Sequence, residues 1–155
     1  MNVHVFYGQG GIVTSGGMWL LANRIRALSP RLNVTTHNWY QPIKINGPTI
    51  LIGYSLGANA VTWNAVSWNS APVALAVCYD PSVLSIVTQP TKSITRLLLY
   101  HNNDIEPEGH AVFVGPQVET TQISMFHLAV CYSEMLHQKT LAAVQKAIAD
   151  NQLLA

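Results

Sequence analysis

The hydrophobic and polar positions of the chain alternate between short strand-like runs and stretches with helical spacing. Strand-like runs lie at 3–7, 33–37, 49–53, 73–79, 94–101 and 118–124. Apolar residues at helical spacing mark 18–28, 56–68 and 128–149. This alternation of strands and helices predicts βαβ units, a parallel sheet and right-handed crossovers.

The alternation changes after His101. Only about ten residues, HNNDIEPEGH, separate the strand-like run 94–101 from the apolar run 111–114. A helical crossover needs a dozen residues or more, so we expect 111–114 to run antiparallel. The prediction is a single α/β domain over 1–155, a three-layer αβα sandwich. Its mostly parallel sheet has about six strands and one antiparallel excursion.

Composition supports a sheet that is covered on both faces, because 49% of the residues are hydrophobic and only 10% are charged. The net charge is +1 without a basic patch, which argues against a nucleic-acid partner. No apolar run approaches the ~20 residues of a membrane span. The first residues, MNVHVFYG, are typical of a strand rather than of a signal peptide, which favours a cytoplasmic location. The oligomeric state stays open.

Cys78 and Cys131 are the two cysteines of the chain. They could pair, but a chain without an export signal favours two buried thiols. Their spacing predicts no metal site.

A candidate nucleophile lies between the predicted strand 49–53 and the predicted helix 56–68. Gly53-Tyr54-Ser55-Leu56-Gly57 matches G-x-S-x-G. In this motif the serine occupies a sharp strand-to-helix turn that projects its hydroxyl above the sheet, and the glycines let strand and helix approach closely. The alternative is a tight glycine-rich turn with an incidental serine. The strand before the motif and the helix after it favour Ser55 as a nucleophile.

A serine hydroxyl needs a general base, and on this kind of sheet the chain order is serine, acid, histidine. Four histidines follow Ser55, namely His101, His110, His127 and His137. His127 is the best candidate because it lies between the last predicted strand and the closing helix, at the same sheet edge as Ser55. His101 and His110 flank strands and could border the site. His137 falls within the predicted helix.

Two aspartates could orient the base. Asp80 directly follows the buried run 73–79 and precedes Pro81, which stiffens the turn. Asp104 follows the next run within Asn-Asn-Asp, a sequence typical of turns. Strand-end positions place side chains more accurately than loops do, so we favour Asp80 and keep Asp104 as the alternative.

The glycine-rich loop after the first strand, GQGG at 8–11, is a candidate oxyanion loop. A tetrahedral intermediate needs two backbone N–H donors. Leu56, after the nucleophile, and Gln9, in this loop, occupy the corresponding positions. A phosphate-binding loop is the competing interpretation. The glycines lack the G-x-G-x-x-G spacing and no acid ends 33–37, which disfavours that alternative.

Taken together, the strand and glycine-rich loop at 3–11, the GYSLG elbow, Asp80 and the late His127 resemble the α/β-hydrolase superfamily. The chain is most similar to its small lidless lipases, cutinases and esterases, including short hydrolases of phage and bacteria. Compared with the usual fold it lacks the first two strands and room for a lid. Asp80-Pro81 is similar to the acid turn of one lipase branch, whereas the commoner family position corresponds to Asp104.

The resemblance implies a serine hydrolase that cleaves carboxylic esters through an acyl-enzyme. It implies small-molecule or lipid-like ester substrates and no metal or organic cofactor. Two alternatives remain: a thioesterase or acyltransferase that uses the same residues, and a binding module without catalysis, because fold does not imply function. Tyr7, Tyr54 and Phe126 neighbour the candidate site in sequence and could line a groove or pack in the core.

Overall fold

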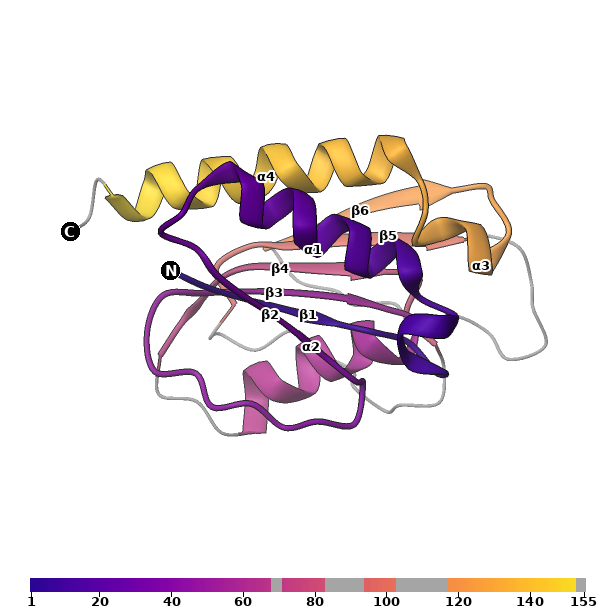
Figure 1. Cartoon of the computed structure of the whole chain (residues 1–155), viewed down its shortest axis with the longest axis horizontal. Coiled ribbons are helices and arrows are strands. Elements are labelled where there is room, and N and C mark those ends of the chain that lie inside the picture. Colours follow the sequence, from indigo (N-terminus) through magenta and orange to yellow (C-terminus); the bar gives the residue numbers. More distant parts are fainter. Residues whose placement is uncertain (68–70, 83–93, 103–116, 153–155) are drawn as a thin grey trace.

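The computed structural model describes residues 1–67, 71–82, 94–102 and 117–152, which form an α/β fold in three layers (Figure 1). The central layer is a six-stranded sheet with the order β2-β1-β3-β4-β5-β6. Its strands are β1 (Asn2–Phe6), β2 (Asn33–His37), β3 (Thr49–Tyr54), β4 (Val73–Tyr79), β5 (Leu97–Asn102) and β6 (Val118–Ile123). Every neighbouring pair of these strands is parallel, so all six end at the same edge of the sheet.

Helices cover both faces of the sheet. On one face lie α1 (Gly16–Leu28) and α4 (Glu134–Gln152), and on the other lies α2 (Leu56–Ser67) (Figure 1). Two short helices, the 3-10 helix η1 (Gly11–Val13) and α3 (His127–Val130), lie at the edge where the strands end. The predicted three-layer sandwich is therefore confirmed.

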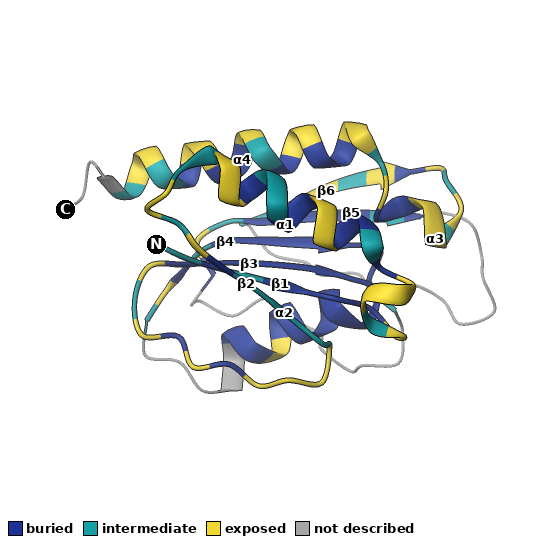
Figure 2. Ribbon diagram, viewed as in Figure 1, coloured by how far each residue is buried: buried dark blue, intermediate teal, exposed yellow. Residues whose placement is uncertain are grey.

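Two hydrophobic cores hold the layers together, one on each face of the sheet. Val5, Ile52 and Val77 pack toward α1 and α4, while Leu51 and Ala76 pack toward α2. Because alternate side chains of a strand point to opposite faces, strands covered on both sides must be apolar throughout. All six residues of β3 are buried, which explains the three consecutive apolar residues Ile50, Leu51 and Ile52 at its centre (Figure 2).

The predicted strands agree with the observed ones to within one residue at each end, except at the start of β5. The runs 33–37 and 73–79 coincide with β2 and β4. The run 94–101 was expected to be a strand throughout, but β5 begins only at Leu97. Ile94 forms just an isolated bridge to Val73. The antiparallel excursion expected at 111–114 lies outside the described residues.

The prediction of one closing helix over 128–149 was wrong, because two helices occupy this region. α3 ends at Val130 and α4 begins at Glu134. The break lies where the start of α1 packs closely against the backbone between α3 and α4. A Cβ on Gly17 would lie 2.0 Å from the carbonyl oxygen of Cys131. Ser133 then starts α4, with its hydroxyl accepting a 3.4 Å hydrogen bond from the amide of Leu136.

Both cysteines are buried free thiols, as expected: Cys78 lies in β4 and Cys131 between α3 and α4.

Across the described part of the chain, no helix combines the length and the apolar character that crossing a membrane requires.

Candidate active site

The candidate site lies next to β1, where successive strands of the chain are added first on one side of the sheet and then on the other. β1 continues to β2 on one side, whereas β3 pairs with β1 on the other side and the later strands follow outward. The loops after β1 and β3 therefore leave the sheet toward opposite faces, and the space between two such loops is the usual ligand position of parallel α/β sheets. The GQGG loop follows β1 and Ser55 follows β3, so both lie at this position.

Ser55 occupies the turn between β3 and α2 in a left-handed backbone conformation, with φ of 56°. A side chain makes this conformation unfavourable, so surrounding bonds must hold it. The amide of Ser55 donates to the carbonyl of Tyr79 at 2.9 Å, and its carbonyl accepts from the amide of Ala58 at 3.0 Å. Ser55 is thus fixed to both β4 and α2, as the G-x-S-x-G motif predicts.

The two glycines of the motif allow backbone contacts that no other residue permits. A Cβ on Gly53 would lie 2.1 Å from the carbonyl oxygen of Gly57. A Cβ on Gly57 would lie 2.5 Å from the carbonyl oxygens of Phe6 and Tyr7. The glycines therefore let the first turn of α2 pack directly against the ends of β3 and β1.

His127 lies between Ser55 and Asp80 and contacts both. Its Nε2 is 3.1 Å from Oγ of Ser55, and its Nδ1 is 2.6 Å from Oδ2 of Asp80. The His127 side chain is 21% exposed and the Asp80 side chain is fully buried. The structure thus brings together the three residues that the sequence favoured, which come from three separate elements.

Asp80 accepts hydrogen bonds from more than His127. It follows β4 with φ of 44°, a second left-handed residue at this edge. The amide of Asn102 donates to its Oδ1 at 3.0 Å, and the side-chain Nδ2 of Asn102 donates to its Oδ2 at 2.9 Å. Burial alone would raise the pKa of Asp80, but hydrogen bonds from His127 and Asn102 lower the pKa below its ordinary value. Asp80 is therefore a carboxylate at neutral pH.

Asn102 is a site residue that sequence reasoning missed. Besides holding Asp80, its Oδ1 accepts a 3.0 Å hydrogen bond from the amide of Met125, two residues before His127. The side chain therefore connects Asp80 to the segment that carries His127. Its position at the end of β5 indicated a residue near the sheet edge, but Asn102-Asn103-Asp104 was interpreted as plain turn sequence.

Tyr54 supports His127 from the other side. Its hydroxyl donates to the backbone carbonyl of His127 at 3.0 Å, and the two rings lie 5.0 Å apart between centroids. Tyr54 is buried, so of the two roles proposed for it, core packing is the one observed. Tyr7 is buried as well, whereas Phe126 is largely exposed beside the site.

The loop after β1 lies against Ser55. A Cβ on Gly8 would lie 3.0 Å from Cβ of Ser55, which leaves room only for glycine without rearrangement. The amide of Gly8 donates to the buried hydroxyl of Ser15, which fixes the loop to the start of α1. Gln9 is the next residue of this loop after Gly8. Leu56 is the first residue of α2, and the first amides of a helix have no acceptor within the helix. Ser15 gave no recognisable sequence signal for this role.

The other candidates of the sequence lie elsewhere or outside the described residues. Asp104 and His110 are outside them. His101 is in β5 with its Nδ1 near the carbonyl of Asn102, and His137 is buried in α4, 2.8 Å from the carbonyl of Cys131. Among the residues with described positions, no three or more His, Cys, Asp or Glu side chains gather as metal ligands.

Comparison of the chain with protein-family models, with curated proteins and with solved structures finds no match.

Proposed function

We propose that the protein is a serine hydrolase that cleaves carboxylic esters through an acyl-enzyme. The observation that carries the proposal is the position of His127, which contacts Ser55 Oγ through one ring nitrogen and the Asp80 carboxylate through the other. A nucleophile, a base in hydrogen-bond reach and a group that orients the base are the requirements of nucleophilic acyl transfer.

In the acylation step, Ser55 Oγ attacks the ester carbonyl carbon while Nε2 of His127 takes the hydroxyl proton. Asp80 accepts a hydrogen bond from Nδ1–H of His127, which keeps Nε2 unprotonated before the attack and stabilises the imidazolium after it. The amides of Leu56 and Gln9 are the proposed donors to the oxyanion. His127 then gives its proton to the leaving alcohol, and the acyl group stays on Ser55.

Deacylation repeats these steps with water as the nucleophile. His127 takes a proton from water, hydroxide attacks the acyl carbon, and Ser55 recovers its proton as the carboxylic acid leaves. The partial exposure of the His127 side chain supports this step, because the base has to act on a water molecule.

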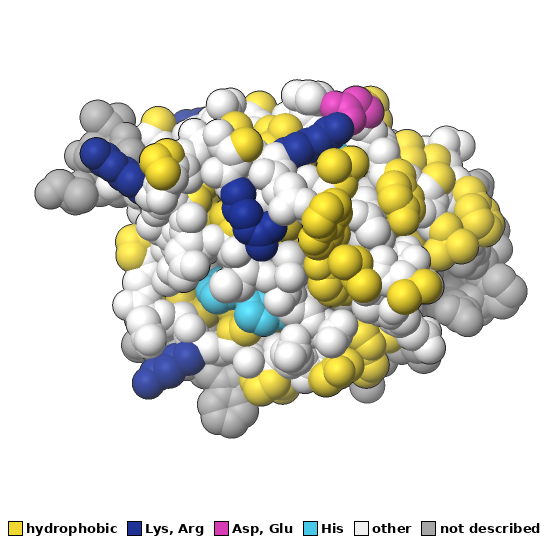
Figure 3. Space-filling model, viewed as in Figure 1, with side chains coloured by type: hydrophobic (Ala, Val, Ile, Leu, Met, Phe, Trp, Pro, Cys, Tyr) yellow, Lys and Arg dark blue, Asp and Glu magenta, His cyan; other side chains and the backbone are white. Residues whose placement is uncertain are grey.

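Exposed apolar side chains support an ester with an apolar acyl or alcohol portion. Ile12 and Val13 in η1, together with Phe126 and Leu128 at α3, are exposed at the edge where the strands end. Figure 3 shows hydrophobic side chains gathered at the end of the molecule that carries α3. Exposed apolar surface is energetically unfavourable in water, so its concentration beside a reactive serine favours contact with apolar ligands.

A fluorophosphonate probe tests the proposal directly, because it phosphonylates only an activated serine. We expect one adduct per chain in intact-protein mass spectrometry, with the modified peptide carrying Ser55. The control is Ser55→Ala, which should stay unlabelled while its circular dichroism matches the wild type. A correctly folded wild-type protein that takes up no label would leave a non-catalytic binding module as the better interpretation.

Substrates of matched structure separate ester from thioester cleavage. We expect p-nitrophenyl esters to be hydrolysed faster than thioesters of the same acyl chain, and longer acyl chains to lower KM. Faster turnover of the thioester would favour the thioesterase alternative, with the same residues in the same roles.

Tyr54→Phe is expected to lower kcat/KM for ester hydrolysis about fivefold. The variant keeps the ring against His127 but removes the hydrogen bond to its carbonyl, and one such bond contributes about 1 kcal/mol. Steady-state kinetics measures the effect. Tyr100→Phe is the matched control, since Tyr100 is a buried tyrosine whose ring packs on Tyr79 instead. Equal kinetics for Tyr54→Phe and the wild type would remove Tyr54 from the residues that position the base.

A further inference from the structure

His137 is a buried histidine to which the proposed reaction assigns no role. It lies in the first turns of α4, and its side chain is fully buried. Each ring nitrogen faces one partner. Nε2 is 2.8 Å from the backbone carbonyl oxygen of Cys131, and Nδ1 is 3.4 Å from a guanidinium nitrogen of Arg24. Cys131 directly follows α3, the helix that begins with His127, so His137 contacts the backbone close to the proposed base.

The two partners define the protonation state of His137. A carbonyl oxygen only accepts hydrogen bonds, so Nε2 carries the ring proton and donates to Cys131. Arg24 only donates, so it faces the lone pair on Nδ1. Burial lowers the pKa of His137 below its ordinary value; the hydrogen bond to Cys131 opposes this in part, and the charge of Arg24 lowers the pKa further. The ring is therefore neutral at pH 7.

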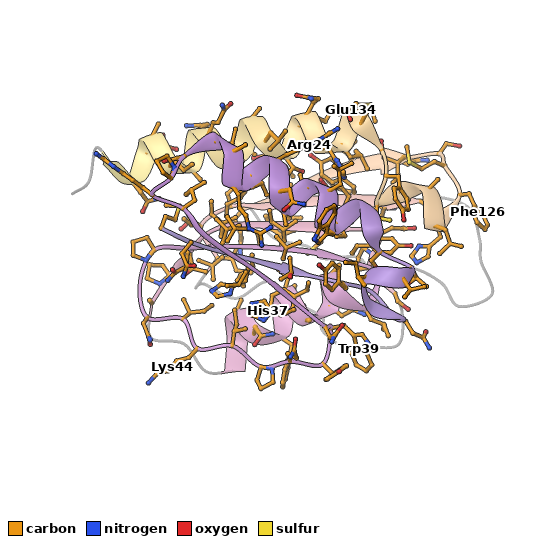
Figure 4. The ribbon with its side chains drawn as sticks, in the orientation of Figure 1. Arg24, His37, Trp39, Lys44, Phe126 and Glu134 are labelled. Carbon is orange, nitrogen blue, oxygen red and sulfur yellow. The ribbon has the colours of Figure 1, made fainter. Side chains whose placement is uncertain are left out.

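An ion pair holds the Arg24 side of this arrangement. A guanidinium nitrogen of Arg24, which lies in α1, is 2.6 Å from a carboxylate oxygen of Glu134, the first residue of α4. Figure 4 labels both residues, where α1 lies beside the start of α4. The ring of His137 thus lies between α1 and the backbone that follows α3, and turning it would break both of its contacts.

α3 depends on contacts with other elements for its orientation. It has only four residues, about one helical turn, and helices this short are unstable without tertiary contacts. Of these four residues only Val130 is buried. Hydrogen bonds from side chains hold its two ends. At the start, the Tyr54 hydroxyl donates to the carbonyl of His127. Just beyond the end, His137 donates to the carbonyl of Cys131.

We propose that His137 is a positioning residue that fixes the end of α3 and thereby the imidazole of His127. The inference rests on the proposed hydrolase function, because it gives His137 a part in the same reaction. His127 and Cys131 are only about 6 Å apart along the helix axis, so a shift at one end moves the other. Nε2 of His127 is 3.1 Å from Oγ of Ser55, near the long limit for such a contact. A displacement of about 1 Å can lower a rate about a hundredfold.

Two amide variants of different length test the role of His137. The amide nitrogen of glutamine is as many bonds from Cα as Nε2 of histidine is, so His137→Gln can still donate to the carbonyl of Cys131. In His137→Asn the amide nitrogen is one bond closer to Cα and falls short of that carbonyl. We expect His137→Asn to lower kcat for a p-nitrophenyl ester about tenfold or more with KM within about twofold, and His137→Gln to keep kcat within about threefold of the wild type.

Thr49→Val is the matched control for a general loss of stability. Thr49 is fully buried at the start of β3, at the opposite end of this strand from Ser55, and its hydroxyl donates to the carbonyl of Gly47 at 2.8 Å. This variant also loses a buried hydrogen bond, so its melting temperature should fall while its kcat stays at the wild-type value. If His137→Asn does not fold, His137→Leu removes the same donor and gives the same comparison.

Proton NMR separates this inference from the proposed function. Nδ1–H of His127 donates to Asp80 with the two atoms 2.6 Å apart, and so short a hydrogen bond should give a far-downfield proton signal. Asp80→Asn assigns the signal by removing it. We expect His137→Asn to shift or broaden the signal and His137→Gln to retain it. If the wild type shows this pattern but hydrolyses no ester, the hydrolase proposal fails and the positioning of His127 by His137 stands.

Three results would overturn the positioning role. The first is a folded His137→Asn variant whose Nδ1–H signal matches the wild type. The second is an equal effect of His137→Asn and His137→Gln on kcat and on the signal, which would show that the hydrogen bond to Cys131 does not hold α3. The third is a loss of kcat in Thr49→Val as large as that in His137→Asn, which would leave His137 with a role in stability alone.

Discussion

The Asp80→Asn variant is expected to lose about four orders of magnitude in kcat for ester hydrolysis while remaining folded. In the wild type, the Asp80 carboxylate accepts a hydrogen bond from Nδ1–H of His127, with Nδ1 and Oδ2 2.6 Å apart. An asparagine side chain can instead offer its amide N–H to Nδ1, which moves the ring proton to Nε2. His127 would then have no lone pair facing Ser55 and could not accept the hydroxyl proton.

Asp104→Asn is the matched control for this variant, because it removes the same charge from the competing candidate acid. We expect its kcat to stay within about twofold of the wild type, because Nδ1 of His127 already has the Asp80 carboxylate as its partner. Steady-state kinetics on both variants, with circular dichroism to verify folding, separates the candidates. A large loss in Asp104→Asn with an active Asp80→Asn would reassign the acid.

The Gly53→Ala variant is expected to lose about 3 kcal/mol of the free energy of unfolding, or to fail to fold. The added Cβ would lie 2.1 Å from the carbonyl oxygen of Gly57, and all three nearest atoms belong to the backbone of the first turn of α2. Backbone cannot rotate away as a flexible side chain can, so β3 and α2 would have to separate. Overpacking of this kind costs about 1–3 kcal/mol or more.

Gly47→Ala is the matched control, because the space around its Cβ position is open to at least 4 Å. We expect this variant to stay within about 0.5 kcal/mol of the wild type. Urea unfolding monitored by circular dichroism gives both values from the shift of the transition midpoint. Similar midpoints for the two variants would contradict the close packing of β3 against the first turn of α2 at Gly53.

Much of the fold followed from the sequence because the strands are buried on both faces. Such strands must be apolar throughout, and the runs at 49–53 and 73–79 are therefore easy to recognise. The start of β5 was missed because Ile94 still forms a bridge to Val73 of β4, while Thr95 and Arg96 interrupt the regular strand, which begins only at Leu97. Sequence patterns record side-chain character and not which backbone groups pair.

The break between α3 and α4 was missed for a related reason. Apolar residues continue at helical spacing across it, and the close contact of Gly17 with Cys131 that accompanies it involves residues more than 100 positions apart. Ser133, a favourable residue for starting a helix, was the local signal available. The helical spacing of apolar residues over 128–149 outweighed the signal from Ser133 in the prediction.

The three principal site residues followed from chain order, but their supporting residues did not. The positions of Ser55, Asp80 and His127 after strands or before helices placed them at one sheet edge. Asn102 and Ser15 act through individual hydrogen bonds, to Asp80 and to Gly8, and no periodic pattern encodes such bonds. The contact of His4 with His37 was not predicted either, since it depends on the register between β1 and β2.

The left-handed backbone at Ser55 and Asp80 has an evolutionary consequence. Both residues hold a conformation that glycine or asparagine adopts more readily, so the proposed reaction is maintained at some expense of stability. Descendants of this chain that no longer need the reaction would gain stability by exchanging these two residues. Glycine or asparagine at both positions would therefore identify a lineage that keeps the fold but no longer carries out the reaction.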